Sequence, residues 1–120
     1  MATNPITDTA LTGHPVISAT GLFTPEESIT NEELVASFNE FVDRHNAANA
    51  EAIEAGEVEA LSHSSVEFIE KASGIKARHV MSKAPILDPD TMEPRLEDRP
   101  NEDISIMAEI GVKAAIQAVE

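Results

Sequence analysis

The side chains that most often do chemistry in proteins are sparse or badly spaced in this sequence. There is no cysteine, which excludes a cysteine nucleophile, a thiolate metal site and a disulfide on this chain. The histidines show neither the HxxxH nor the HExxH spacing of zinc sites. They stand at four separate positions: His14, His45, His63 and His79. We therefore expect no catalytic residue and no metal site on this chain.

The other common chemical motifs are also missing. The acidic stretch DPDTMEPRLED at 88–98 lacks the glycine and the register of a calcium-binding loop. The glycines do not form a glycine-rich loop that could hold phosphate. Ser64 and Ser65 are not flanked by the glycines of a nucleophile elbow.

The charge balance limits the partners that the chain can bind. It has 22 acidic and 8 basic residues among 120, and a formal net charge of −14. Such a surface repels phosphate backbones and anionic lipid headgroups, so we expect no nucleic acid partner. No stretch reaches the roughly 20 apolar residues of a membrane span. The absence of cysteine fits a cytoplasmic protein, which we expect.

The length predicts one domain, and its core has an unusual composition. The hydrophobic content of 42% predicts a packed core, whereas the aromatic content of 3% is low for a self-contained one. The first residues, 1–14, lack the basic and apolar regions of a signal peptide. We expect them to be a flexible lead-in to a domain over 15–120.

The first half of that domain predicts a strand and a helix. Val16–Phe23 has small or apolar residues on both alternating faces, which is typical of a central strand in an α/β sheet. Thr30 and Glu33 form a capping-box pattern that starts a helix over Asn31–Arg44. The Ala/Glu-rich residues that follow, 46–61, are expected to form a solvated helix broken near Gly56.

The second half predicts another helix and strand. Ser64 and Glu67 form a second capping-box pattern, and the short helix that they start is expected to end at a left-handed Gly74. The alternation of Ile75–Met81 predicts a strand. Within it we expect Arg78 to make a structural ion pair, His79 a structural hydrogen bond, and Lys76 no evident contact.

The last two segments of the chain have unusual patterns. Residues 82–101 hold four prolines, which predicts no regular element there. Such a segment often borders a functional site, and a surface insertion without a role is the open alternative. From Ile104 to Val119 the polar residues form one narrow stripe: Ser105, Glu109, Lys113 and Gln117.

A helix with one polar stripe is expected to be buried on most sides. The few other elements cannot cover it. We therefore expect the chain to be a fragment, or one chain of a split protein, completed by a larger remainder.

Four short motifs follow one another along the chain: a G-x-F-x-P turn, a T-N-x-E-L helix start, an S-G-I-x-x-R strand preceded by an aromatic residue, and an S-x-M-A helix start. They occupy Gly21–Pro25, Thr30–Leu34, Ser73–Arg78 with Phe68, and Ser105–Ala108. In this order they resemble the amino-terminal region of β-ketoacyl-acyl carrier protein synthase III, of the thiolase superfamily. The segments at 43–63 and 82–101 are longer than in typical members. The resemblance implies an α/β, thiolase-like fold, of which this chain is the amino-terminal strand–helix portion.

The resemblance also implies a reaction and its partners. Members take an acyl group from acyl-coenzyme A onto a cysteine and condense it with malonyl-acyl carrier protein. They form dimers, and coenzyme A thioesters serve as substrate rather than as cofactor. Their Cys-His-Asn set would have to come from a carboxy-terminal remainder, because this chain has no cysteine.

The coenzyme A entrance of the family maps onto three residues here. An aromatic residue at the Phe68 position stacks on the adenine, and a hydroxyl at the Ser64 position lies beside it. Ala72 replaces the arginine that the family has, so Lys71 substitutes for it or the donor is a carrier-protein thioester. The alternative is that Phe68 packs inward beside Ile69.

Two other functions remain open. The chain could belong to a non-catalytic, ketosynthase-like partner subunit that shapes a tunnel or a dimer. It could also be an acidic interaction module with an unrelated fold.

Overall fold

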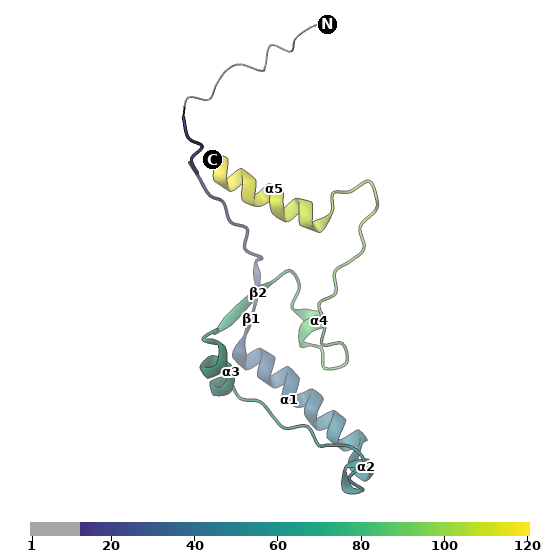
Figure 1. Ribbon diagram of the computed structural model, residues 1–120. Coiled ribbons are helices and arrows are strands. Elements are labelled where there is room, and N and C mark those ends of the chain that lie inside the picture. The colour runs from purple at the N-terminus through teal and green to yellow at the C-terminus, as the bar shows by residue number, and fades with distance from the viewer. Residues whose placement is uncertain (1–12) are drawn as a thin grey trace, which may run out of the picture. The chain divides into compact units, whose positions relative to one another are not determined.

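A computed structural model describes residues 13–120 of the chain. The lead-in expected at 1–14 therefore lies almost wholly outside the described residues. The described part is mixed α/β, as expected, with two strands and five helices. Its residues form two compact units, 24–103 and 13–23 with 104–120, which we describe separately (Figure 1).

The larger unit is built on two short antiparallel strands. β1 (Glu27–Thr30) pairs with β2 (Ala77–Val80), and Ile29 lies opposite Arg78. The strand expected at Ile75–Met81 is thus confirmed in its central part. Its partner β1 was not expected, because the four residues ESIT carry little apolar pattern of their own.

The central strand expected at Val16–Phe23 is wrong. Residues 14–25 form no regular element, and the side chains of Val16 and Ile17 are 81% and 89% exposed. A strand buried on both faces needs hydrogen-bonded neighbours and covering layers. The described residues provide neither for this segment.

α1 (Asn31–Ala48) starts as expected and runs past Arg44. The Thr30 hydroxyl accepts a hydrogen bond from the Glu33 N–H at 3.2 Å, and the Glu33 carboxylate accepts one from the Thr30 N–H at 3.0 Å. This capping box pairs two amide groups that a helix start leaves without partners. The buried apolar residues of the described chain are Ile29 on β1 and Val42 on α1.

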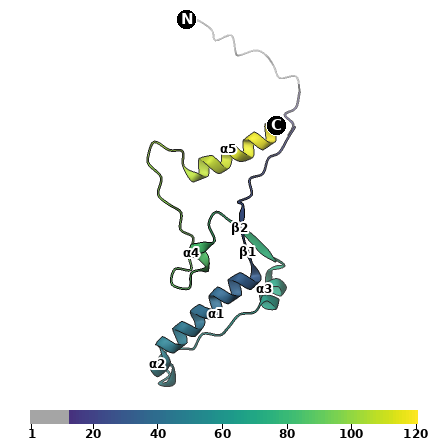
Figure 2. The same ribbon diagram turned by 180° about the vertical axis from the view of Figure 1, so that it is seen from behind.

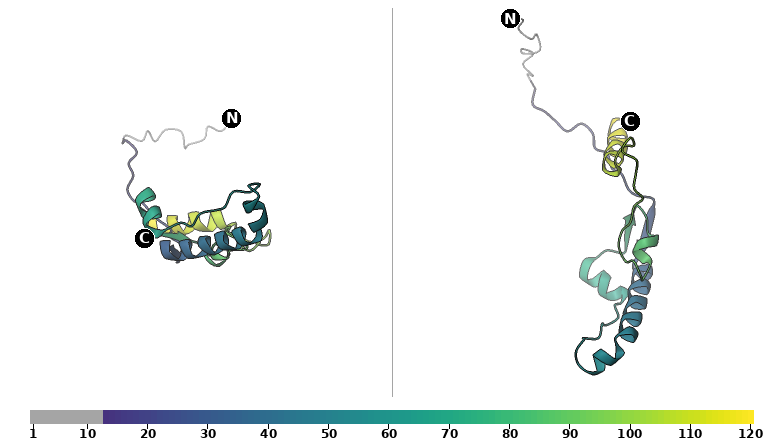
Figure 3. Two further views of the ribbon diagram at one scale, coloured as in Figure 1. Left: turned by 90° about the horizontal axis from the view of Figure 1, so that it is seen from below. Right: turned by 90° about the vertical axis from the view of Figure 1, so that its right-hand side faces the viewer.

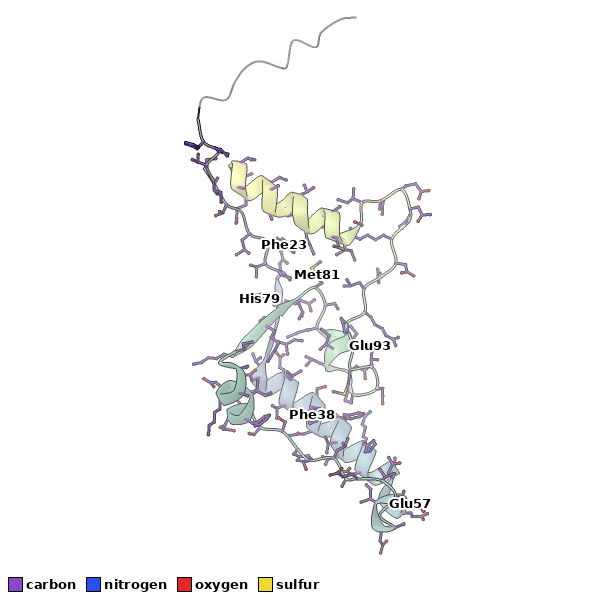
Figure 4. All side chains as sticks on the ribbon, viewed as in Figure 1. Phe23, Phe38, Glu57, His79, Met81 and Glu93 are labelled. Atoms are coloured by element: carbon purple, nitrogen blue, oxygen red, sulfur yellow. The ribbon has the colours of Figure 1, made fainter. Side chains whose placement is uncertain are left out.

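α2 (Ala50–Glu54) and a turn follow α1 within the acidic stretch 43–63. The turn contains Gly56 at a φ of +74°, so the break expected near this glycine is confirmed. In Figure 2 α2 lies at the end of α1 that is far from the strands. Glu57 marks this turn in Figure 4.

α3 (Val66–Ser73) begins one residue later than expected. Its cap is Ser65, whose hydroxyl accepts from the Phe68 N–H at 3.1 Å, so the capping box of Ser64 and Glu67 is wrong. The physical reason is that the backbone N–H and carbonyl of Ser64 are both bonded to the Asn39 side chain of α1. Gly74 ends the helix at a φ of +70°, as expected.

The proline-rich segment contains a short helix that was not expected. α4 (Ala84–Leu87) carries Pro85 in its first turn, where the missing N–H costs nothing because a helix start leaves that group unpaired. The Ser37 hydroxyl of α1 donates to the Leu87 carbonyl at 2.8 Å. Both α3 and α4 contact α1, and they lie beside it in Figure 3.

The smaller unit is a helix with an extended segment along it. α5 (Ile106–Val119) is capped by Ser105, whose hydroxyl accepts from the Ala108 N–H at 3.2 Å. The Glu109–Lys113 ion pair expected along its polar stripe is present at 2.7 Å. No residue of α5 is buried among the described residues.

The polar stripe of α5 holds the extended segment. The Gln117 side chain accepts from the Leu22 N–H at 2.6 Å, and the Lys113 ammonium lies 5.1 Å from the centre of the Phe23 ring. A side chain at Gly21 would collide with the Ala114 carbonyl oxygen, so only glycine fits this approach.

No helix of the described residues combines the length and the apolar character that crossing a membrane requires.

Candidate functional site

The second and third motifs meet at one buried side chain. The Asn31 N–H donates to the Lys76 carbonyl at 3.2 Å, and its side-chain amide donates to the Ile75 carbonyl at 2.7 Å. The Asn31 side-chain oxygen accepts from the Arg78 guanidinium at 3.1 Å. Asn31 is 2% exposed, and all of its polar side-chain atoms are paired. Among residues 13–120, Arg78 thus makes a hydrogen bond to an amide in place of the ion pair that was expected for it.

Other motif residues also hold the scaffold. The Ser73 hydroxyl donates to the Ile69 carbonyl at 2.8 Å and accepts from the Ile75 N–H at 3.2 Å. The Nδ1 atom of His79 lies 2.9 Å from the Pro25 carbonyl oxygen, which confirms its structural hydrogen bond. Lys76 pairs with Glu70 at 3.4 Å, a contact that was not expected. These residues stabilise the strands and the helix ends and do not form a reactive site.

The backbone that leads into α3 is bound to the side chains of α1. The Asn39 side chain accepts from the Ser64 N–H at 2.8 Å and donates to the Ser64 carbonyl at 3.1 Å. About two turns further along α1, Asn46 makes the same two bonds to Leu61, at 3.0 and 2.9 Å. Each amide satisfies both backbone groups of one residue, as a neighbouring strand would do. The end of the acidic stretch 43–63 therefore has a defined position on α1.

A third side chain of α1 lies between these two. The Asp43 carboxylate is 2.7 Å from the Nε2 atom of His63. Asn39, Asp43 and Asn46 are four and three residues apart, so they share one face of the helix. We call this arrangement the α1 ladder.

An open groove of about 670 Å³ lies where the ladder meets the start of α3. Its lining comes from α1, the connecting segment and α3: Phe38, Ser62, His63, Ser64, Ser65 and Phe68. Figure 4 labels Phe38 on α1. Ser64 and Phe68, two of the residues that the resemblance singles out, both line this groove.

Phe68 does not pack inward. Its side chain is 67% exposed, whereas the neighbouring Ile69 is half-buried. Ile69 lines a separate apolar pocket of about 280 Å³ with residues of α1 and of the proline-rich segment: Leu34, Val35, Phe38, Ser64 and Met92. Among the described residues, Phe68 therefore does not share the packing of Ile69.

Lys71 lies on α3 less than one turn after Phe68 and is exposed. It is outside the lining of the groove, and it makes no ion pair among the described residues. Ala72 is exposed as well, so the position of the family's arginine is open to solvent. The structure leaves Lys71 near the groove without placing it in the lining.

One carboxylate near this scaffold has a shifted pKa. The hydrogen bond from the Thr30 N–H, with a further one from Lys83 at 2.9 Å, lowers the pKa of Glu33 below its usual value. Both partners stabilise the ionised carboxylate. The lowered pKa reflects the contacts of Glu33 at the start of α1, and Glu33 does not line the groove.

No three histidine, cysteine or acidic side chains among residues 13–120 gather closely enough to hold an ion.

Sequence reasoning missed His63 and Phe38 as groove residues. The signal that could have found them is the spacing of Asn39, Asp43 and Asn46 on one helix face. A polar helix face is usually solvated, so the pattern by itself does not reveal that it binds a backbone segment.

No protein-family model matches the chain. A relative of the β-ketoacyl-acyl carrier protein synthase class is 55% identical over 84 residues, which are 70% of this chain and 24% of the relative. That relative is the beta-ketodecanoyl-[acyl-carrier-protein] synthase of Pseudomonas aeruginosa. The chain is therefore similar to part of a β-ketoacyl-acyl carrier protein synthase, which confirms the resemblance that its motifs carry. It spans about a quarter of the length of this relative.

Proposed function

We propose that this chain is part of a condensing acyltransferase of the β-ketoacyl-acyl carrier protein synthase type. The enzyme takes an acyl group from acyl-coenzyme A or an acyl carrier protein and joins it to malonyl-acyl carrier protein, with loss of carbon dioxide. The observation that carries the proposal is the identity of 55% over 84 residues to a synthase of this class. The match supports the enzyme over a non-catalytic partner subunit or an unrelated interaction module.

The nucleophile in this proposal lies outside the chain. The sequence has no cysteine, so a remainder of the same protein supplies the Cys-His-Asn set and completes a thiolase-like fold. The complete enzyme acts as a homodimer in the cytoplasm and uses coenzyme A thioesters as substrate, with no separate cofactor. This chain contributes part of the scaffold and part of the donor site.

The name of the relative suggests a chain length. Its product is a β-ketodecanoyl group. Because the condensation adds the two carbons left from malonate, we propose an octanoyl donor for the protein that contains this chain.

The donor enters at the groove beside α3. The exposed ring of Phe68 offers a flat face to the adenine, and the Ser64 hydroxyl lies in the same groove. Lys71 supplies a cation near the groove in place of the arginine that Ala72 replaces. An ammonium binds phosphate as a point charge and without the bidentate geometry of arginine, so we expect a weaker phosphate contact.

The test is condensation by the complete protein with octanoyl-coenzyme A and malonyl-acyl carrier protein. Mass spectrometry of the carrier protein is expected to show the β-ketodecanoyl adduct. Reactions without the donor are the control, and a series of shorter and longer acyl-coenzyme A donors tests the proposed length. Absence of condensation with every acyl-coenzyme A and every acyl carrier protein donor would show that the protein is not this enzyme.

A further inference from the structure

His63 is a groove residue whose ring contacts a carboxylate of α1. Its Nε2 atom lies 2.7 Å from the Asp43 carboxylate, and its side chain is 55% exposed. It lines the same groove as Phe68. It is therefore both oriented by the protein and open to a ligand.

The partner of Nε2 decides what the other ring nitrogen can do. A carboxylate only accepts hydrogen bonds, so the Nε2–H of His63 must donate to Asp43. In the neutral imidazole the second nitrogen is then an acceptor. The Nδ1 atom of His63 has no hydrogen bond among the described residues, so this acceptor remains for a ligand.

The backbone on either side of His63 is fixed as well. Ser64 is bonded to Asn39 through both its N–H and its carbonyl, and Leu61 is bonded to Asn46 in the same way. The imidazole is thus held both through its backbone and through its ring. Such a pre-organised acceptor loses little freedom when a ligand binds.

We infer that the Nδ1 atom of His63 accepts a hydrogen bond from the exocyclic amine of the adenine that stacks on Phe68. This inference rests on the proposed function, because that function brings an adenine to the groove. Adenine presents an N–H donor on its exocyclic nitrogen, whereas hypoxanthine presents a carbonyl oxygen at the same position. An acceptor at this point selects the first base and repels the second.

The test compares three octanoyl donors that carry adenine, hypoxanthine or no base. Steady-state kinetics of the complete protein are measured with octanoyl-coenzyme A, with its deaminated hypoxanthine analogue, and with octanoyl-acyl carrier protein, which has no base. His63→Ala is expected to raise KM for octanoyl-coenzyme A by about 3- to 10-fold, the usual range for one hydrogen bond. The kcat with this donor and the kinetics with the carrier-protein donor should remain unchanged.

The hypoxanthine analogue gives the sharper readout. The unmodified protein is expected to prefer the adenine donor, and His63→Ala to lose that preference. Asp43→Asn tests the tautomer, because an amide can donate to Nε2 and so permits a proton on Nδ1. Asp43→Asn should therefore reduce the preference with the imidazole still present, while Glu57→Gln, on the exposed turn after α2, should preserve it.

The outcomes separate this inference from the proposed function. If Phe68→Ala raises KM for the coenzyme A donor and His63→Ala does not, the role of His63 is wrong and the groove remains the donor site. If His63→Ala weakens both donors equally or lowers the melting temperature, His63 is a structural residue and the inference is overturned. If neither variant distinguishes the two donors, the groove is not the donor site and the inference is overturned. Condensation by the complete protein then still tests the proposed function.

Discussion

Phe68 and Glu33 show how the surroundings of a single side chain define what it can contribute. The Phe68 ring is 67% exposed on a short helix, so its removal leaves little core empty. Glu33 is tied to the Thr30 N–H and to Lys83, so its charge matters for the start of α1. Substitution of Phe68 is therefore expected to change activity more than stability, and substitution of Glu33 to change stability more than activity.

Phe68→Ala is expected to weaken the use of acyl-coenzyme A with little change in melting temperature. A base stacked on an aromatic ring contributes about 1–3 kcal/mol, or roughly 5- to 150-fold in kcat/KM. Kinetics with coenzyme A and carrier-protein donors measure the effect, and Phe68→Tyr is the control that keeps the ring. A loss of about 3–5 kcal/mol of stability would instead place Phe68 in a core.

Ala72→Arg restores the cation that the family has at this position. Because Ala72 is exposed on the same helix as Phe68, the guanidinium can reach solvent beside the groove without displacing packed atoms. We expect this variant to bind octanoyl-coenzyme A more tightly than the unmodified protein does. Its affinity for octanoyl-pantetheine, a donor without nucleotide phosphates, should equal that of the unmodified protein. Calorimetric titration measures both, and Lys71→Ala should weaken the first alone.

Glu33 predicts a pH dependence of stability. Its pKa in the folded protein is lowered, so its ionised form adds stability above the ordinary pKa of 4.5. That stability is lost as the pH falls through the lowered pKa. In the complete protein, Glu33→Gln keeps an acceptor for the Thr30 N–H but has no charge. The melting temperature of this variant should therefore fall less between about pH 6 and about pH 3 than that of the unmodified protein. Glu32→Gln, which does not cap the helix, should behave as the unmodified protein does.

At the scale of elements, two segments without regular structure are held by side chains of a helix. Asn39 and Asn46 bind the backbone at Ser64 and Leu61 on α1. On α5, Gln117 binds the Leu22 N–H. A polar face of a helix is ordinarily covered by solvent. In each of these two cases it holds an extended segment in place.

Gly21→Ala is expected to separate the extended segment from α5. The added methyl would collide with the Ala114 carbonyl and lie 2.8 Å from the Ala118 nitrogen, and such overpacking costs about 1–3 kcal/mol. Hydrogen exchange of the Leu22 amide should speed up, since its bond to Gln117 is lost. Gly13→Ala, which meets nothing within 4 Å, should leave that exchange unchanged.

At the scale of the whole molecule, the described residues bury little apolar surface. Ile29 and Val42 are the buried apolar side chains, at 2% and 1% exposure. The sheet has two short strands, and a two-stranded sheet is marginal in water by itself. On α5, Met107 and Val119 are 85% and 84% exposed.

Residues 1–120 expressed alone are therefore expected to be insoluble or to lack a cooperative unfolding transition. So few buried side chains cannot offset the entropy of ordering the chain. Calorimetry and near-ultraviolet circular dichroism provide the measurement, with the complete protein as the control. A sharp thermal transition from these residues alone would contradict the proposed remainder.

The features that could be predicted from the sequence are those whose hydrogen bonds close within a few residues. Thr30 and Glu33 cap α1, Gly74 ends α3 in a left-handed conformation, and Ser105 starts α5. The motifs that identified the family lie largely at these positions. Local bonding rules are the same wherever the segment is placed, so the residue types suffice.

The remaining features depend on partners distant in the chain, and only the tertiary structure decided them. Ser64 cannot cap α3 because Asn39, 25 residues away, binds its backbone. β1 forms because β2 lies beside it, and Val16–Phe23 stays without a strand because the described residues offer it no neighbour. The pairing of His63 with Asp43 likewise joins a connecting segment to a helix face. Apolar alternation and helical spacing indicate which secondary structures a segment can adopt. The available hydrogen-bond partner determines which of them forms.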